Sequence, residues 1–165
     1  MSESSVDEFG SEYGAPVVFV SAQDARTAAR NANLPKRVFE YWERYGFSKF
    51  LDGYFQILNP ADYQGALALW LQRATADSEE KYHALTMDSF GNVQIWGEAT
   101  GHVFDIDVSM HAVFDNERNN VDCIKSGRGD RMVEDLFFVA SPEKMAENSE
   151  DGNVRLFFAA KDKLG

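Results

Sequence analysis

The sequence predicts an α+β fold in which an antiparallel sheet, a meander of four to five strands, packs with N-terminal and C-terminal helices. Three observations predict this fold. Apolar residues repeat at three and four positions in residues 34–71, alternate with polar residues in residues 82–114, and return to helical spacing after residue 130. Helices, then a run of strands, then helices again are typical of α+β domains.

Length and composition indicate one folded core. The chain has 165 residues, of which 44% are hydrophobic and 13% aromatic, and two full domains of about 150 residues each would need a longer chain. The single cysteine, Cys123, cannot form an internal disulfide, and the acidic N-terminus does not resemble a secretory signal. We therefore expect a cytoplasmic protein that does not enter a membrane.

The net charge of the chain indicates which class of macromolecule it can bind. The chain has 16 lysine and arginine residues against 27 aspartate and glutamate residues, so its formal net charge is −11. Both halves of the chain are acidic, so the charge belongs to the whole body. Such a surface repels a phosphate backbone, and we expect no direct contact with nucleic acid. It favours encounter with a basic protein instead.

The first third of the chain predicts an arm, a short extended segment and one clear helix. Residues 1–16 are polar, with Phe9 and Tyr13 as their aromatic anchors, and are expected to form a flexible N-terminal arm. Residues 17–20 suit a strand or an extended entry segment, and the alanine-rich residues 21–30 suit a helical turn or two. Asn33 as cap and Pro35 in the first turn begin a helix that ends at Gly46.

A strand and a second capped helix precede the meander. Residues 54–58 read as a strand after Gly53. Asn59 is the expected cap of the next helix, with Pro60 in its first turn. The buried stripe of this helix is expected to comprise Tyr63, Leu67, Trp70 and Leu71.

The meander starts with a hairpin of residues 82–88 and 92–96 around a turn at Gly91. Residues 101–110 alternate next, with His102 and Phe104 on one face and Asp105 and Asp107 on the other. Residues 111–114 suit a further strand, and residues 115–120 suit a polar turn. Residues 131–139 have helical spacing, and two more helices are expected from residue 141 and over residues 154–164.

Histidine and carboxylate residues form the one cluster in which a metal site or acid–base chemistry is conceivable. His102, Asp105, Asp107 and His111 lie close together in sequence. Strand alternation separates the imidazole of His102 from both carboxylates, and we expect no metal, no cofactor and no catalytic residue. Cys123 has no histidine beside it in sequence and is expected to be an inert thiol.

An acidic stretch remains as the candidate binding surface. It contains no lysine or arginine between residues 100 and 118. Such a stretch is either a solvated face or a place where a cationic protein docks, because complementary potentials steer association. The candidate contact residues are Asp105, Asp107, Asp115 and Glu117.

Four separated blocks of the sequence resemble the GAD-like domain in order and spacing; they span residues 34–47, 51–63, 82–85 and 90–97. The resemblance implies a GAD-like α+β domain at residues 17–120. Residues 121–165 would then be a C-terminal helical segment, in which residues 156–165 are similar to the start of a second module. The resemblance leaves open whether the chain is a shorter family member or is truncated within that module. It further implies the N-terminal part of a Tdi-type immunity protein, a partner of DNase toxins exported by type VI secretion systems.

The leading hypothesis is therefore an immunity protein that is not an enzyme. It binds a cognate DNase toxin and blocks the toxin's DNA-binding or catalytic region. One alternative is a sensor or enzyme that holds a small ligand or metal with His102 and His111. The other is an interaction module unrelated to any toxin.

Overall fold

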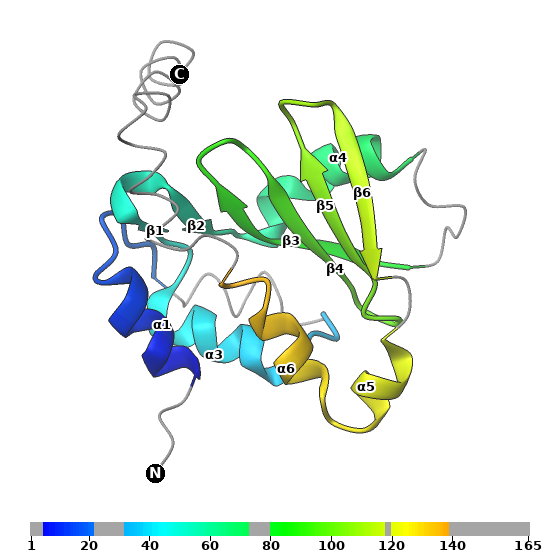
Figure 1. Ribbon diagram of the computed structural model, residues 1–165, viewed down its shortest axis with the longest axis horizontal. Coiled ribbons are helices and arrows are strands. Elements are labelled where there is room, and N and C mark those ends of the chain that lie inside the picture. The colour runs from blue at the N-terminus through cyan, green and yellow to red at the C-terminus, as the bar shows by residue number, and fades with distance from the viewer. Residues whose placement is uncertain (1–4, 22–31, 73–79, 118–119, 139–165) are drawn as a thin grey trace.

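The computed structural model describes residues 5–21, 32–72, 80–117 and 120–138 of the chain (Figure 1). The helices are α1 (Ser5–Tyr13), α3 (Lys36–Tyr45), α4 (Pro60–Leu71), α5 (Val121–Lys125) and α6 (Gly129–Glu134), with a 3₁₀ helix η1 (Leu51–Gly53). The strands are β1 (Lys49–Phe50), β2 (Phe55–Ile57), β3 (Tyr82–Asp88), β4 (Val93–Gly97), β5 (Val103–Asp107) and β6 (Ala112–Glu117). None of the described helices is long and apolar enough to span a membrane.

The strands form one antiparallel sheet in the order β1-β2-β3-β4-β5-β6, so the predicted α+β meander is confirmed. The sheet has six strands, which exceeds the predicted four to five. The difference arises mainly at β1, because two residues are too few to produce an alternating pattern. The polar turn expected at residues 115–120 is wrong in its first part, since Asp115 to Glu117 continue β6.

Two apolar layers cover opposite faces of the sheet. Successive residues of a strand point to opposite sides, and β4 shows this at the centre of the molecule, where Ile95 packs in one cluster and Trp96 in the other. The Ile95 cluster lies under α4. The Trp96 cluster lies against α1, α3 and α6, which sit side by side in Figure 1.

Local sequence signals place the two longest helices. The predicted helix before Gly46 is α3, and its apolar stripe is buried as expected. Asn33 is not its cap, because the helix begins one residue after Pro35 and has no capping side chain of its own. The cap predicted for α4 is confirmed, since Asn59 accepts a hydrogen bond from the backbone N–H of Ala61 at 3.2 Å.

The N-terminal segment is not a flexible arm in its central part. Residues 5–13 form α1, and Val6, Phe9 and Tyr13 are buried. These three residues are spaced at helical intervals and therefore project from one side of α1 into the core. Phe9 stacks on Tyr13 with ring centroids 4.3 Å apart, and the hydroxyl of Ser5 donates to Glu134 of α6. Helix α1 is thus an integral part of the fold.

The remaining predicted elements lie near the ends of the described segments or outside them. Residues 17–20 run antiparallel to residues 47–49 through three backbone hydrogen bonds, as an extended entry segment. The helix predicted at residues 131–139 is α6, which starts and ends earlier than expected and follows the short helix α5. The helices expected within residues 21–30, from residue 141 and at residues 154–164 lie outside the described residues.

Candidate partner-binding surface

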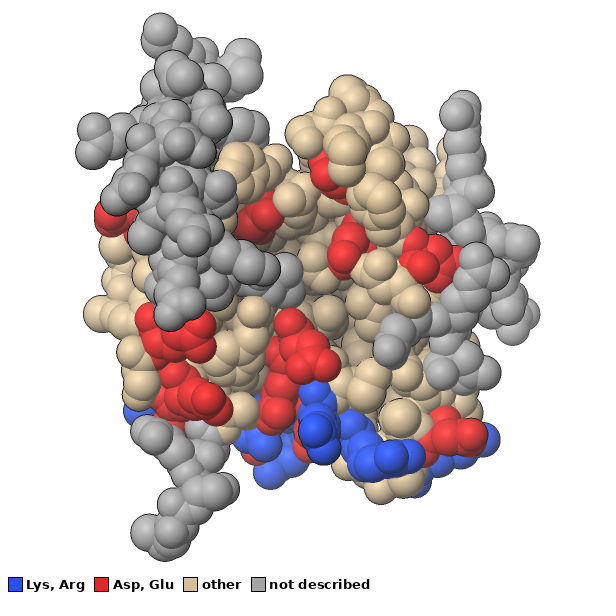
Figure 2. Space-filling model, viewed as in Figure 1, with Lys and Arg blue, Asp and Glu red and all other residues tan. Residues whose placement is uncertain are grey.

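The meander from β3 to β6 carries one sign of charge. Residues 82–117 contain no lysine or arginine. Figure 2 shows the basic side chains gathered over the helical side of the molecule, whereas acidic side chains are spread over both the helices and the strands. The carboxylates of the meander are Asp88, Glu98, Asp105, Asp107, Asp115 and Glu117.

The four predicted contact residues do not share one face of the sheet. Asp115 lies directly opposite Phe104, and Asp105 lies opposite Phe114. Opposite residues of an antiparallel pair project to the same side, so Asp115 shares the α4 side with Phe104. Asp105 and Asp107 project to the other side, and Glu117 lies opposite Val103 beyond a β-bulge. The structure therefore brings together Asp105 and Asp107 but separates Asp115 from them.

Asp105 is half-buried in the sheet. Burial raises the pKa of its carboxyl group above the usual value, while hydrogen bonds with Asn116 and Gln94 act in the opposite direction. Its Oδ1 atom is buried and has no hydrogen-bond partner among the described residues. Asp105 therefore has unused capacity to accept a hydrogen bond.

Asp107 organises the turn between β5 and β6. Its Oδ1 accepts hydrogen bonds from the Ser109 hydroxyl at 2.7 Å and from the Met110 N–H at 2.9 Å. These bonds lower the pKa of its carboxyl group, so the turn carries a fixed negative charge. Beside it lies an exposed apolar group, called here the hairpin tip, that comprises Val108, Met110 and Phe114.

Asp115 is hydrogen-bonded to the histidine that directly precedes the neighbouring strand β5. Its Oδ1 lies 2.8 Å from His102 Nε2, and His102 Nδ1 lies 3.3 Å from the Tyr82 hydroxyl. The imidazole also packs on the ring of Phe104 with centroids 3.9 Å apart. Asp115 of β6 is thus linked through His102 to Tyr82 of β3.

The two histidines of the alternative site lie at opposite ends of β5. His102 precedes the strand and His111 lies in the turn that follows it. Five strand residues at about 3.3 Å each separate them by roughly 16 Å, which is too far for both to bind one metal ion. Among the described residues no three histidine, cysteine or acidic side chains are grouped closely enough to hold a metal.

The family of the chain follows from a comparison with known families. The model of the GAD-like domain matches residues 4–110, which is more than half of the chain. The chain belongs to the GAD-like domain family. The matched range begins before residue 5, so α1 lies within the matched part of the GAD-like domain.

Solved structures show the same fold for this GAD-like protein. The crystal structure of Atu4351 from Agrobacterium tumefaciens is similar, with a TM-score of 0.54 and 22% sequence identity. The similarity covers 72% of this chain and 55% of that one, so the GAD-like protein spans about half the length of that neighbour. No curated protein matches the chain.

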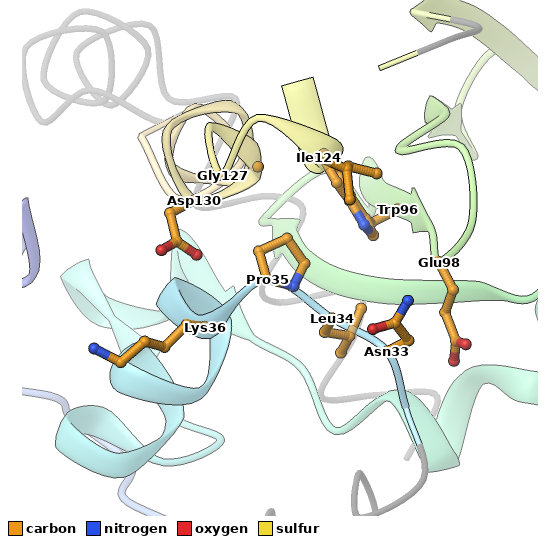
Figure 3. Close-up of a pocket in the computed structure, with 10 residues that line it drawn as sticks. Asn33, Leu34, Pro35, Lys36, Trp96, Glu98, Ile124, Gly127 and Asp130 are labelled. Atoms are coloured by element: carbon orange, nitrogen blue, oxygen red, sulfur yellow. The ribbon is translucent and has the colours of Figure 1, made fainter. Parts of the chain in front are cut away.

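A pocket that the sequence does not indicate lies between the helical and strand parts of the GAD-like domain. Its volume is about 180 Å³, and it opens where the start of α3 meets β4, α5 and α6. Figure 3 shows residues from all these regions converging on it. Its walls include Asn33, Leu34, Pro35, Trp96, Glu98 and Ile124. The sequence marks these residues as core or loop positions, because only the tertiary packing brings them together.

Proposed function

We propose that this GAD-like protein is an immunity protein that binds and neutralises a DNase toxin of a type VI secretion system in the cytoplasm. It acts by covering the toxin's DNA-binding or catalytic region and catalyses no reaction. A GAD-like domain fits a protein-interaction module. The observation that carries the proposal is the meander of residues 82–117, which has six carboxylates and no lysine or arginine.

The surface around the hairpin tip has the chemistry that a basic protein would recognise. Met110 is 62% exposed and Phe114 is 43% exposed, and both lie close in the hairpin to the carboxylates of Asp105 and Asp107. An exposed apolar group rimmed by charge is a common feature of protein interfaces. The apolar side chains supply buried contact area, and the carboxylates steer the partner and select its sign of charge.

A nuclease is a fitting partner because its substrate is a polyanion. A protein that binds DNA presents lysine and arginine to the phosphates. An acidic protein surface of complementary shape competes with DNA for these lysine and arginine side chains. When it binds the nuclease tightly, it excludes the DNA. The meander supplies the acidic surface, while the basic residues of this protein lie mainly over the helices (Figure 2).

Co-expression with the nuclease encoded by a neighbouring gene tests the proposal. We expect the nuclease to be toxic alone and harmless beside this protein, and the two purified proteins to form a complex. Met110→Ser at the hairpin tip is expected to weaken the complex, because it removes an exposed apolar contact. Leu69→Ser is the matched control, since Leu69 is also an exposed apolar residue, at 76%, but belongs to α4 and not to the β5–β6 hairpin. Toxicity that persists at full level beside this protein would contradict the proposal.

A further inference from the structure

Strand β6 forms one edge of the sheet. It pairs with β5, and among the described strands none lies on its outer side (Figure 1). Phe114 of this strand is 43% exposed, and Asp115 and Asn116 are exposed as well. An edge strand carries backbone N–H and C=O groups that the ladder does not use. The outer side of β6 is therefore accessible to an extended segment of another chain.

One hydrogen bond fixes the direction in which the backbone groups of β6 point. The N–H of Gly97 donates to the carbonyl of His102 at 2.8 Å, which makes these two residues a hydrogen-bonded pair between β4 and β5. Such pairs recur at every second residue of an antiparallel ladder. Residues of β5 therefore alternate between β4 and β6, and Asp105 forms its backbone bonds with Phe114 of β6. Val113, one residue earlier, directs its N–H and C=O to the outer side.

The side chains of β6 present two different surfaces to a strand added at this edge. Opposite residues of a ladder project to the same side of the sheet. A residue opposite Phe114 would lie on the side away from α4, beside the exposed aromatic ring. A residue opposite Asp115 would lie on the α4 side, where the Asp115 side chain is 27% exposed although it is bonded to His102. The edge thus favours an apolar residue followed by a basic one.

The charge around the edge favours some partners over others. Residues 103–117, which form β5, β6 and their turn, contain four carboxylates and no lysine or arginine. Hydrogen bonds lower the pKa of Asp107, which keeps its carboxylate ionised. A second copy of β6 would place like charges across the new ladder, which is destabilising. A strand that carries lysine or arginine is attracted instead, so the charges favour a basic segment of a different protein.

We propose that β6 binds an extended basic segment of a partner protein as a seventh strand of the sheet. The backbone of the segment exchanges hydrogen bonds with the N–H and C=O of Val113. An apolar residue of the segment packs on Phe114, and the next residue, a lysine or arginine, lies beside Asp115. Main-chain hydrogen bonds hold such a strand, and side chains at alternate positions select it. The identity of the partner rests on the proposed function, because a protein that binds DNA carries basic segments.

Hydrogen exchange of the Val113 amide tests the added strand directly. In the ¹⁵N-labelled full chain alone this N–H faces solvent and should exchange rapidly. In the complex with the neighbouring nuclease we expect it to exchange more slowly, by about tenfold or more, because it is hydrogen-bonded there. The control is the N–H of Phe19 at the opposite edge of the sheet, which has no backbone partner among the described residues. Its exchange should not change.

Two pairs of matched variants measure what the edge contributes to affinity. Val113→Pro removes the outward N–H, and proline is tolerated on edge strands. Val18→Pro makes the same change at the opposite edge, where the N–H of Val18 has no backbone partner among the described residues. Phe114→Ser removes an exposed ring from β6. Its control is Phe19→Ser, because Phe19 is also an exposed ring, at 58%, but lies at the opposite edge.

We expect Val113→Pro and Phe114→Ser each to weaken the complex about tenfold, since each removes one contact of the added strand. The variants at the opposite edge should keep the affinity of the unchanged protein. Circular dichroism checks the folding of each variant, and if Val113→Pro does not fold, Phe114→Ser and the amide exchange of the unchanged protein decide.

A complex that forms without slower exchange at Val113 would overturn the added strand and leave the proposed function standing. Equal affinities in all four variants would do the same. Equal weakening at both edges would also overturn the added strand, because the effect would not be specific to β6.

A capped peptide separates the two proposals when no nuclease binds. The probe is acetyl-Lys-Val-Lys-Val-Lys-amide added to the ¹⁵N-labelled full chain, with acetyl-Glu-Val-Glu-Val-Glu-amide as control. We expect the amide resonance of Val113, assigned from the Val113→Pro variant, to move with the basic peptide alone. Such a shift without nuclease binding supports the added strand and overturns the toxin as partner.

Two other results would overturn the added strand. One is a Val113 resonance that responds to neither peptide. The other is exchange at Val113 that slows as the concentration of this protein alone rises, which would assign the edge to a second copy of the chain.

Discussion

The backbone N–H of Arg37 donates a 2.9 Å hydrogen bond to Asp130 Oδ1, so a side chain of α6 caps the N-terminus of α3 across 93 positions of sequence. Helix N-termini leave backbone N–H groups without partners inside the helix. Pro35 precedes this helix and cannot cap it with a side chain. The bond therefore ties the stability of α3 to the docking of α6.

Removing this cap tests its contribution to stability. We expect Asp130→Ala to lower the free energy of unfolding by about 1 kcal/mol, as loss of a helix cap does. Asp130→Asn keeps an acceptor oxygen and should lose less. Urea unfolding followed by circular dichroism measures both, with Asp135→Ala, an exposed change just after α6, as control. Equal stability of Asp130→Ala and the unchanged protein would mean that the cap is replaced by water.

The packing of α1 gives a second prediction. Phe9 is completely buried among the rings of Tyr13, Tyr41 and Phe50. Phe9→Ala should lower the free energy of unfolding by about 3–5 kcal/mol, because it leaves a cavity in the core. Glu12→Ala on the exposed side of α1 should change it little. A small effect of Phe9→Ala in chemical denaturation would mean that residues 5–13 are a dispensable arm after all.

Asp105 gives a prediction about pH. Burial raises the pKa of Asp105 in the folded protein, so ionisation of this group opposes folding. The penalty is absent below the unfolded-state pKa of about 3.9, grows between that pKa and the higher folded-state pKa, and is complete above the folded-state pKa. Asp105→Asn removes the penalty and should raise the free energy of unfolding at neutral pH. Measured by urea denaturation, its advantage should shrink as the pH approaches about 4.

The control for this prediction is Glu12→Gln, which removes one exposed carboxylate from α1. Its stability relative to the unchanged protein should depend little on pH. If Asp105→Asn raised the free energy of unfolding by the same amount at neutral pH and near pH 4, the role of burial would be contradicted. A variant less stable at neutral pH would show that the ionised carboxylate is needed for packing.

Salt dependence tests how the acidic meander contributes to binding. The distance over which charges act on one another, the Debye length, falls from about 10 Å at 0.1 M salt to about 3 Å at 1 M. Association with the nuclease should therefore slow markedly over this range of salt concentration. Asp107→Asn removes charge yet keeps an oxygen that can accept from Ser109, and it should flatten the salt dependence. Stopped-flow association rates provide the measurement. Rates independent of salt would point to a mainly apolar interface.

The sequence predicted those parts of the fold that local chemistry determines. The cap at Asn59 and the hairpin around Gly91 were correct, because a cap and a tight turn depend on adjacent residues. The helix at residues 5–13 was missed although Val6, Phe9 and Tyr13 have helical spacing, since Gly10 and the polar composition outweighed that short pattern. Local signals thus defined most elements but underestimated a short helix that is stabilised by tertiary packing.

The candidate site was predicted less well because it depends on register. The pairing of Asp115 with His102 depends on the register that sets Asp115 opposite Phe104, which alternation within one strand does not reveal. The pocket at Trp96 requires four elements to meet, and no spacing along the chain encodes that meeting. Acidic composition was therefore a poor guide to the arrangement of the contact residues, and the basic partner that it suggests stays a prediction.

The most direct test of the central claim is a plasmid-cleavage assay with the neighbouring nuclease and this protein, both purified. Supercoiled DNA is incubated with the nuclease while the amount of this protein is increased, and the Met110→Ser and Leu69→Ser variants are run in parallel. The account predicts that cleavage stops near an equimolar ratio, and that Met110→Ser needs more protein than Leu69→Ser to reach the same protection. Undiminished cleavage at a large molar excess of this protein would contradict the account.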